Sequence, residues 1–119
     1  MSAVLVLIVE DDYLVRLHAV FILEDAGFGV LEAASADEAI ALLEVRRDIR
    51  IVFTDINMPG SMDGLRLAHA IRNRWPPIEL VVTSGQMRVR KEDMPARGLF
   101  LGKPYEPSEL VQMVRSLAS

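Results

Sequence analysis

The sequence of 119 residues predicts an α/β fold, in which a doubly wound parallel sheet of five strands carries helices on both faces. Two observations predict this class. Five short apolar runs, several of them rich in β-branched residues, are typical of strands that are buried in a parallel sheet. Longer segments with helical spacing separate the runs, and this alternation favours right-handed crossovers from each strand to the next.

The five expected strands lie at regular intervals along the chain. They are residues 3–9 (AVLVLIV), 28–34 (FGVLEAA), 49–54 (IRIVFT), 78–83 (IELVVT) and 98–102 (GLFLG). A length of 119 residues fits one domain, residues 1–119, with no separate effector domain expected.

Helical spacing marks the segments between the strands and the segment after the last one. The expected inward faces are Val15, Ala19, Ile22 and Ala26 within residues 12–26, which end at Gly27; Ala39, Ile40 and Leu43 after a capping box of Ser35 and Glu38; Ala68, Ile71 and Trp75 within residues 64–75; and Leu110, Val111, Val114 and Leu117 after Pro107. Residues 85–97 lack such a stripe, so we expect the fourth helix to be short or irregular. Four apolar residues outside the stripe of the first helix predict contact with a second copy or another partner, and they are Leu14, Leu17, Val20 and Phe21.

Composition excludes several classes of function. The chain has no cysteine, so it has no disulfide, thiolate zinc site or cysteine nucleophile. Its net charge is −4 and it has no dense basic run, which argues against direct binding of nucleic acid. The first apolar run is too short for a signal peptide or a membrane span. We therefore expect a cytoplasmic protein that does not contact a membrane.

Polar side chains stand at the ends of four of the five expected strands. The first strand is followed by Glu10, Asp11 and Asp12, the third by Asp55, the fourth by Thr83 and Ser84, and the fifth by Lys103. The second strand ends in small residues. If the strand order is 2-1-3-4-5, the four polar ends are neighbours, and ligands of such sheets bind at this edge, where the strand order reverses.

These residue types suit one kind of chemistry when they lie together. Crowded carboxylates repel each other and stay ionised when a cation lies among them. Oxygen ligands in small number suit Mg²⁺, with Asp11 and Asp55 as direct ligands, Glu10 acting through water and the backbone carbonyl of Asn57 completing the set. A lysine and a hydroxyl would then complement the oxygens of a phosphoryl group.

Four segments, VLIVEDD, VFTDINMPGSMDG, LVVTSG and LGKPY, resemble in order and spacing the receiver domain of two-component response regulators. The resemblance covers nearly the whole chain. It implies the flavodoxin-like strand order 2-1-3-4-5. It also implies that Asp55 accepts a phosphoryl group from a histidine kinase or a phosphotransfer protein, while Glu10 and Asp11 hold Mg²⁺.

The same resemblance assigns the switch residues. Thr83 would bond the acyl phosphate and report it by reorienting, and Lys103 would pair with Asp55 or with its phosphate. Phe100 stands three residues before the lysine, at the position of the aromatic switch of the family, which is often a tyrosine. A phenylalanine there can change rotamer with Thr83 but has no hydroxyl to bond.

The predicted function is that of a signalling phosphoacceptor, and not that of an enzyme that turns over a separate substrate. It would undergo self-phosphorylation and slow dephosphorylation, and it would act by phosphorylation-controlled binding of an unknown downstream protein or by onward phosphorelay. A phosphohydrolase of the haloacid dehalogenase type is one alternative, although that class places D-x-D after its first strand and this chain has EDD. A receiver-fold scaffold that is never phosphorylated is the other alternative.

Overall fold

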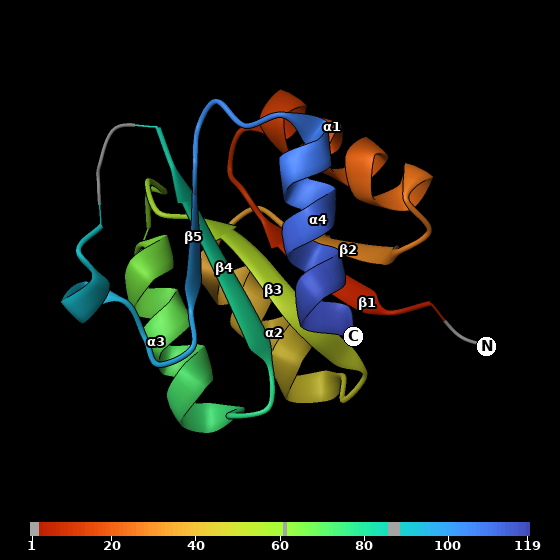
Figure 1. Cartoon of the computed structure of the whole chain (residues 1–119). Coiled ribbons are helices and arrows are strands. Elements are labelled where there is room, and N and C mark those ends of the chain that lie inside the picture. Colours follow the sequence, from red (N-terminus) through yellow and green to blue (C-terminus); the bar gives the residue numbers. More distant parts are fainter. Residues whose placement is uncertain (1–2, 61, 86–88) are drawn as a thin grey trace.

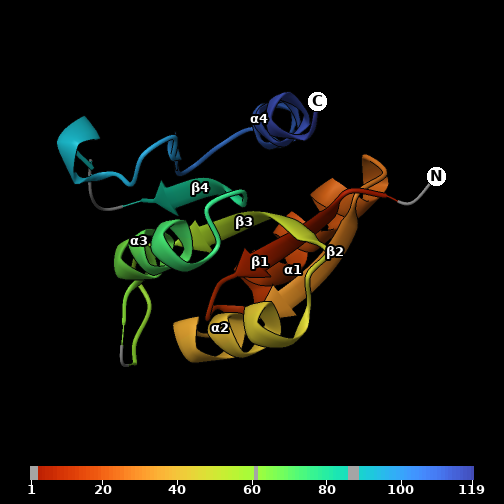
Figure 2. The same ribbon diagram turned by 90° about the horizontal axis from the view of Figure 1, so that it is seen from below.

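The computed structural model describes residues 3–60, 62–85 and 89–119, and it confirms the predicted fold class. Five parallel strands form one sheet in the order β2-β1-β3-β4-β5, with α1 and α4 on one face and α2 and α3 on the other (Figures 1 and 2). The strands are β1 (Leu5–Val9), β2 (Gly29–Ala33), β3 (Ile49–Asp55), β4 (Glu79–Ser84) and β5 (Leu99–Gly102). The helices are α1 (Tyr13–Asp25), α2 (Ala36–Val45), α3 (Gly64–Arg74) and α4 (Pro107–Ala118).

Side-chain oxygens cap the amino ends of the first three helices. Asp12 accepts from two amides of α1, Ser35 accepts from the amide of Glu38, and Asp63 accepts from an amide of α3. These contacts satisfy amides that have no partner within the helix. The predicted cap at Ser35 is thus confirmed, although the Glu38 carboxylate accepts from the amide of Ala34 and not from that of Ser35.

Alternation along the strands gives the sheet two cores, because successive side chains point to opposite faces. The core under α2 and α3 contains buried residues such as Leu7, Val9, Val52, Leu80 and Val82. The core under α1 and α4 contains Val6, Ile8, Ile51, Phe53, Val81 and Leu101. With both faces covered, the central strands are nearly continuous in apolar residues, as the sequence predicted.

The prediction of which face of α1 is buried is partly wrong. Ala19 is buried as expected, but Val15 is exposed, and the other buried residues of α1 are Val20 and Leu23. The helix packs against α4 as well as against the sheet, so its buried face is set by two neighbours and is wider than a single stripe. Leu14 and Phe21 are exposed, whereas Val20 is buried in the core, so the expectation that Val20 contacts a partner is wrong.

Within the described part of the 85–97 segment, the regular structure is one turn of 3-10 helix, η1 (Lys91–Asp93), so the prediction of a short fourth helix is confirmed there. Side chains of α3 hold this turn in place. A ring nitrogen of His69 lies 2.7 Å from the carbonyl oxygen of Asp93, and Arg72 donates to the carbonyl of Ala96. Among the described residues, no helix combines the length and the apolar character needed to cross a membrane.

Candidate functional site

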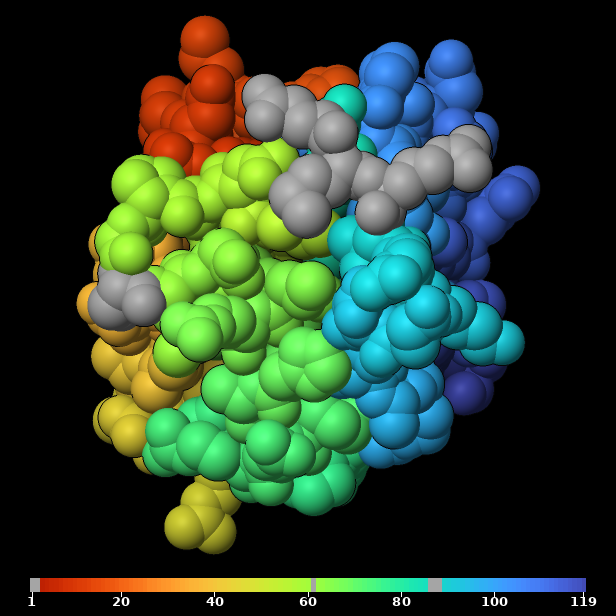
Figure 3. Space-filling model, turned by 90° about the vertical axis from the view of Figure 1, so that its left-hand side faces the viewer, coloured from red at the N-terminus to blue at the C-terminus, as the bar shows by residue number. Residues whose placement is uncertain are grey.

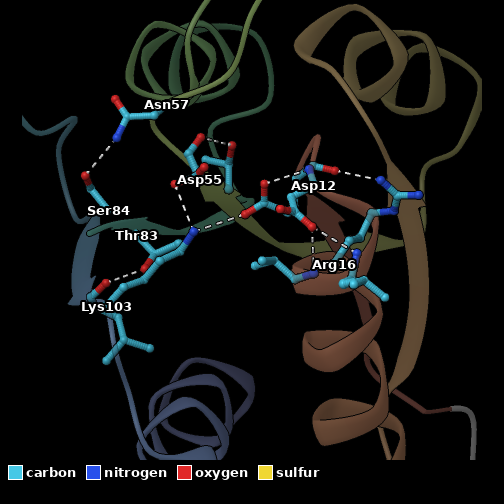
Figure 4. Close-up of polar contacts among 12 residues, drawn as sticks. Asp12, Arg16, Asp55, Asn57, Thr83, Ser84 and Lys103 are labelled. Carbon is cyan, nitrogen blue, oxygen red and sulfur yellow. Dashed lines mark hydrogen bonds and ion pairs between the residues drawn. The ribbon is translucent and has the colours of Figure 1, made fainter. Parts of the chain in front are cut away.

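Four polar side chains point to the same face at the carboxyl edge of the sheet. Each stands two positions after a buried residue of the core under α1 and α4, and the pairs are Ile8 and Glu10, Phe53 and Asp55, Val81 and Thr83, and Leu101 and Lys103. Because a strand repeats every two residues, the last core residue fixes the direction of the polar one. Four neighbouring strands thereby bring their polar ends into one place (Figure 4).

Three carboxylates form a cluster at this edge. One carboxylate oxygen from each of Glu10, Asp11 and Asp55 lies within 4.8 Å of the others. Glu10 is 5% exposed and Asp55 is 6% exposed, whereas Asp11 faces solvent. Two buried carboxylates beside a third repel each other strongly, so the cluster favours a cation among its oxygens.

Lys103 supplies one cation to the cluster. Its Nζ atom lies 3.1 Å from Oε1 of Glu10 and 3.4 Å from Oδ1 of Asp55. The first contact is a hydrogen bond, while the second is an ion pair that leaves the buried Oδ1 without a hydrogen-bond partner among the described residues. Burial lowers the pKa of Lys103, but the two carboxylates outweigh burial and raise this pKa overall. Lys103 is therefore a charged ammonium at neutral pH.

The second carboxylate, Glu10, is held by several contacts. Its Oε2 atom accepts from the amide of Asp12 at 3.0 Å, which fixes the side chain next to the cap of α1. Burial is the main effect on its carboxyl group and raises its pKa above the usual value, although the amide of Asp12 and Lys103 oppose the shift. A Glu10 carboxylate that lies among these neighbours would gain from a further cation.

Arg16 supports this loop from α1 and was missed by the sequence analysis. Its guanidinium donates to the carbonyl of Glu10 at 2.8 Å and to Oε1 of Glu32 at 2.9 Å, so it ties the acidic loop to β2 (Figure 4). The signal in the sequence was Glu32, a charged residue inside the apolar run of β2. Neither Arg16 nor Glu32 stands at the end of a strand, so the pattern of polar strand ends does not include them.

Arg16→Ala is expected to lower the free energy of unfolding by about 2 kcal/mol, because it removes charge-assisted hydrogen bonds from a largely buried guanidinium. The side chain of Arg16 is 14% exposed. Urea denaturation would measure the loss, with Arg46→Ala as the matched control, since the pair of Arg46 with Asp48 is 41% and 59% exposed and is expected to contribute little. Equal losses in both variants would contradict the supporting role of Arg16.

Hydroxyl and amide groups line the other side of the site. Thr83 is buried and donates its hydroxyl hydrogen bond to the carbonyl of Leu101 on β5. Asn57 lies in the loop after β3 and donates its side-chain amide to Oγ of Ser84 at 3.3 Å (Figure 4). This bond links the loop after β3 to the end of β4.

Two aromatic residues pack near the site in different ways. Phe100 pairs in register with Val82 and is partly buried against the core under α2 and α3. Tyr105, which the sequence analysis did not select, packs edge-on against Phe53 with ring centroids 6.0 Å apart. Burial, and then the charges of Glu10 and Asp55, raise the pKa of Tyr105 to about 12. Its phenol therefore stays neutral at physiological pH.

The backbone of Asp55 is fixed by its contact with the first residue of α3. The amide of Gly64 donates to the carbonyl of Ile56 at 3.0 Å, and the amide of Ile56 donates to the carbonyl of Thr83 at 2.9 Å. An ideal Cβ atom on Gly64 would overlap the carbonyl oxygen of Asp55. A glycine is needed here because the helix and the strand end approach too closely for any side chain.

The residues of the cluster fit a divalent cation with oxygen ligands. Within the described part of the chain, the buried Oδ1 of Asp55 has no hydrogen-bond partner, and one carboxylate oxygen each from Glu10 and Asp11 lies close enough to share an ion with Asp55. The donor set is all oxygen, which suits Mg²⁺ better than zinc or copper. A cleft of about 340 Å³ opens onto these carboxylates and is also bounded by Asn57 and Lys103, so a phosphoryl group has room beside the ion.

The fold and this site together define a class of protein: a doubly wound α/β domain whose carboxyl edge presents three carboxylates, a lysine and a buried threonine. The chain belongs to the response regulator receiver domain family, whose model it matches over residues 6–115. This membership confirms the resemblance that the four sequence segments predicted.

Known proteins similar to this chain agree with that assignment. It is 36% identical to the sensor kinase CckA of Brucella abortus over 94% of the chain, and 34% identical to the aerobic respiration control protein ArcA of Escherichia coli K12 over 96% of the chain. The chain spans 12% of the first and 48% of the second.

Solved structures show the same fold. A response regulator receiver protein from Sinorhizobium medicae superposes with a TM-score of 0.90 at 29% identity, covering 97% of this chain and 94% of that one. A CheY-like receiver domain from Methanospirillum hungatei gives a TM-score of 0.85 at 26% identity, covering 98% and 95%. The predicted strand order 2-1-3-4-5 is confirmed by the sheet itself, and both solved structures share the fold.

Proposed function

We propose that this chain accepts a phosphoryl group on Asp55 in a Mg²⁺-dependent reaction and signals by phosphorylation-controlled protein binding or onward phosphorelay. The observation that carries the proposal is the buried carboxylate of Asp55, whose Oδ1 has no hydrogen bond to any residue that the structure describes and lies 3.4 Å from the ammonium of Lys103. A nucleophile held at a rigid strand end beside a cation suits phosphoryl transfer, which depends mainly on positioning and charge neutralisation.

The donor would be a phosphohistidine of a histidine kinase or a phosphotransfer protein. One carboxylate oxygen of Asp55 attacks phosphorus, the new P–O bond forms as the P–N bond breaks, and the bonding electron pair returns to the imidazole nitrogen. Lys103 neutralises charge on the phosphoryl oxygens. Bound by Glu10, Asp11, Asp55 and the backbone carbonyl of Asn57, Mg²⁺ would supply further positive charge at these oxygens. Later attack of water on phosphorus would restore the Asp55 carboxylate and release phosphate.

The switch would begin at Thr83. Its hydroxyl donates to the carbonyl of Leu101, and it would exchange this bond for one to a phosphoryl oxygen of phosphorylated Asp55. Phe100 lies on the neighbouring strand but packs against the core on the other face of the sheet, so its ring would change rotamer in response to a shift of β4 and β5. Because a phenyl ring has no hydroxyl, this movement would be driven by packing alone, and the altered β4 and β5 surface would be read by the partner protein.

The test is incubation with acetyl phosphate and Mg²⁺, followed by intact-mass measurement. We expect addition of one phosphoryl group to the native chain and none to Asp55→Asn or to a sample treated with EDTA. If acetyl phosphate fails, a phosphorylated phosphotransfer protein is the second donor. Failure with both donors would overturn the proposal in favour of a receiver-fold scaffold, whereas repeated turnover of a small phosphate ester would favour the phosphohydrolase alternative.

A further inference from the structure

A second concave site lies at the opposite end of the sheet from the carboxylate cluster. It is a groove of about 540 Å³ between the end of α2, the start of β3 and the Arg74–Ile78 segment that joins α3 to β4. In Figure 3, the end of α2 and the loop after it, in yellow, lie beside the end of α3, in green, at the lower edge of the molecule. The volume is that of an ordinary small-molecule site.

The rim of the groove is strongly basic although the chain carries a net charge of −4. The described residues that line it include four arginines, at positions 46, 47, 50 and 74, and a single carboxylate, Glu44. Arg46 pairs with Asp48 at 2.8 Å and Arg74 pairs with Glu44 at 2.9 Å. Among the described residues, Arg47 and Arg50 have no carboxylate partner, so their guanidinium groups are available to an anion from solution.

The floor of the groove is apolar and aromatic. Buried Leu43, Ile49 and Ile78 line it, together with the half-buried ring of Trp75. The guanidinium carbon of Arg74 lies 4.3 Å from the centroid of the Trp75 ring. This cation–π contact holds the Arg74 side chain against the ring at one side of the groove. An apolar floor under a cationic rim suits a ligand with an apolar or aromatic body and an anionic end.

We propose that this groove binds a ligand of the nucleotide class, with its phosphate on Arg47 and Arg50 and its base over the floor beside Trp75. Planar guanidinium groups match phosphate oxygens, and the surfaces of Trp75, Pro76 and Pro77, which line the groove, match a base. The groove holds one small molecule, and the negative charge of the rest of the chain opposes a long polyanion. None of the carboxylates of the Asp55 site lines it, so this site is independent of the proposed phosphoryl transfer.

Trp75 is the single tryptophan of the sequence, so its fluorescence reports on the groove directly. The native chain would be titrated with the sodium salts of AMP and ATP in the presence of EDTA, with N-acetyltryptophanamide correcting for absorbed light. We expect saturable quenching with a Kd below about 1 mM. The double variant Arg47→Ala/Arg50→Ala is expected to bind at least ~10-fold more weakly, as loss of charge-assisted contacts to phosphate predicts.

A matched control is Arg90→Ala, which removes an exposed arginine that pairs with Glu92 and Asp93 outside the groove. It is expected to bind as the native chain does. Quenching that does not saturate, or a double variant that binds like the native chain, would overturn the proposal. Equal binding of inorganic phosphate and AMP would show that the groove binds the phosphate alone, and it would overturn the proposed recognition of the base. Saturation by a polyglutamate peptide but not by nucleotides would replace the proposed ligand with an acidic protein segment.

Discussion

Gly64→Ala is expected to lower the free energy of unfolding by about 3 kcal/mol, at the upper end of what overpacking usually costs. The added Cβ atom would overlap the carbonyl oxygen of Asp55 and lie 2.6 Å from its carbonyl carbon. Neither partner is the end of a flexible side chain, so the strand end or the start of α3 has to move. Urea denaturation measures the stability, and the rate of phosphorylation by acetyl phosphate reports whether Asp55 has been displaced.

The control for this substitution is Gly102→Ala in β5. A Cβ atom there would meet Cε2 of Phe100 at 3.7 Å, which is an ordinary contact, so we expect little change in stability. A Gly64→Ala variant that unfolds at the same urea concentration as Gly102→Ala would show that the junction of β3 and α3 can shift at little cost in free energy. Asp55 would then not be held rigidly by its backbone.

Most of the fold could be predicted from sequence because each strand and helix carries its own local pattern. Apolar runs such as residues 49–54 gave β3 (Ile49–Asp55) almost to the residue, and Ser35 marked the start of α2. The buried face of α1 could not be predicted as well from a local pattern. Val20 is buried because α4, from the far end of the chain, covers it, and a helical stripe contains no information about a distant neighbour.

The same distinction applies to the site. The side chains of Glu10, Asp55, Thr83 and Lys103 could be found because each stands at a strand end, and parallel strands all present that end at one edge. Arg16 and Tyr105 could not be found in this way. Arg16 is positioned by its hydrogen bond to Glu32, which is distant along the chain. Tyr105 is positioned by the contact of its ring with Phe53. Such contacts depend on tertiary packing and leave only weak local signals.

Lys103→Ala is expected to lower the rate of phosphorylation of Asp55 by at least ~100-fold, a typical effect of removing one charge-stabilising donor from a transition state. The ammonium of Lys103 lies 3.1 Å from Glu10 and 3.4 Å from Asp55, where it neutralises the carboxylates and would meet the phosphoryl oxygens. Acetyl phosphate with saturating Mg²⁺ and timed intact-mass measurements would give the rate for the variant and the native chain.

A measurement of Mg²⁺ affinity separates this role from a structural one. The ammonium and the ion would share the negative charge of the same carboxylates, so removing Lys103 is expected to leave Mg²⁺ binding unchanged or tighter while transfer slows. A general loss of structure would weaken both. Lys91→Ala, in η1, removes an exposed lysine and serves as the control, with native behaviour expected in both assays. A folded Lys103→Ala variant that is phosphorylated at the native rate would exclude Lys103 from the transfer, and charge neutralisation at Asp55 would then fall to Mg²⁺ alone.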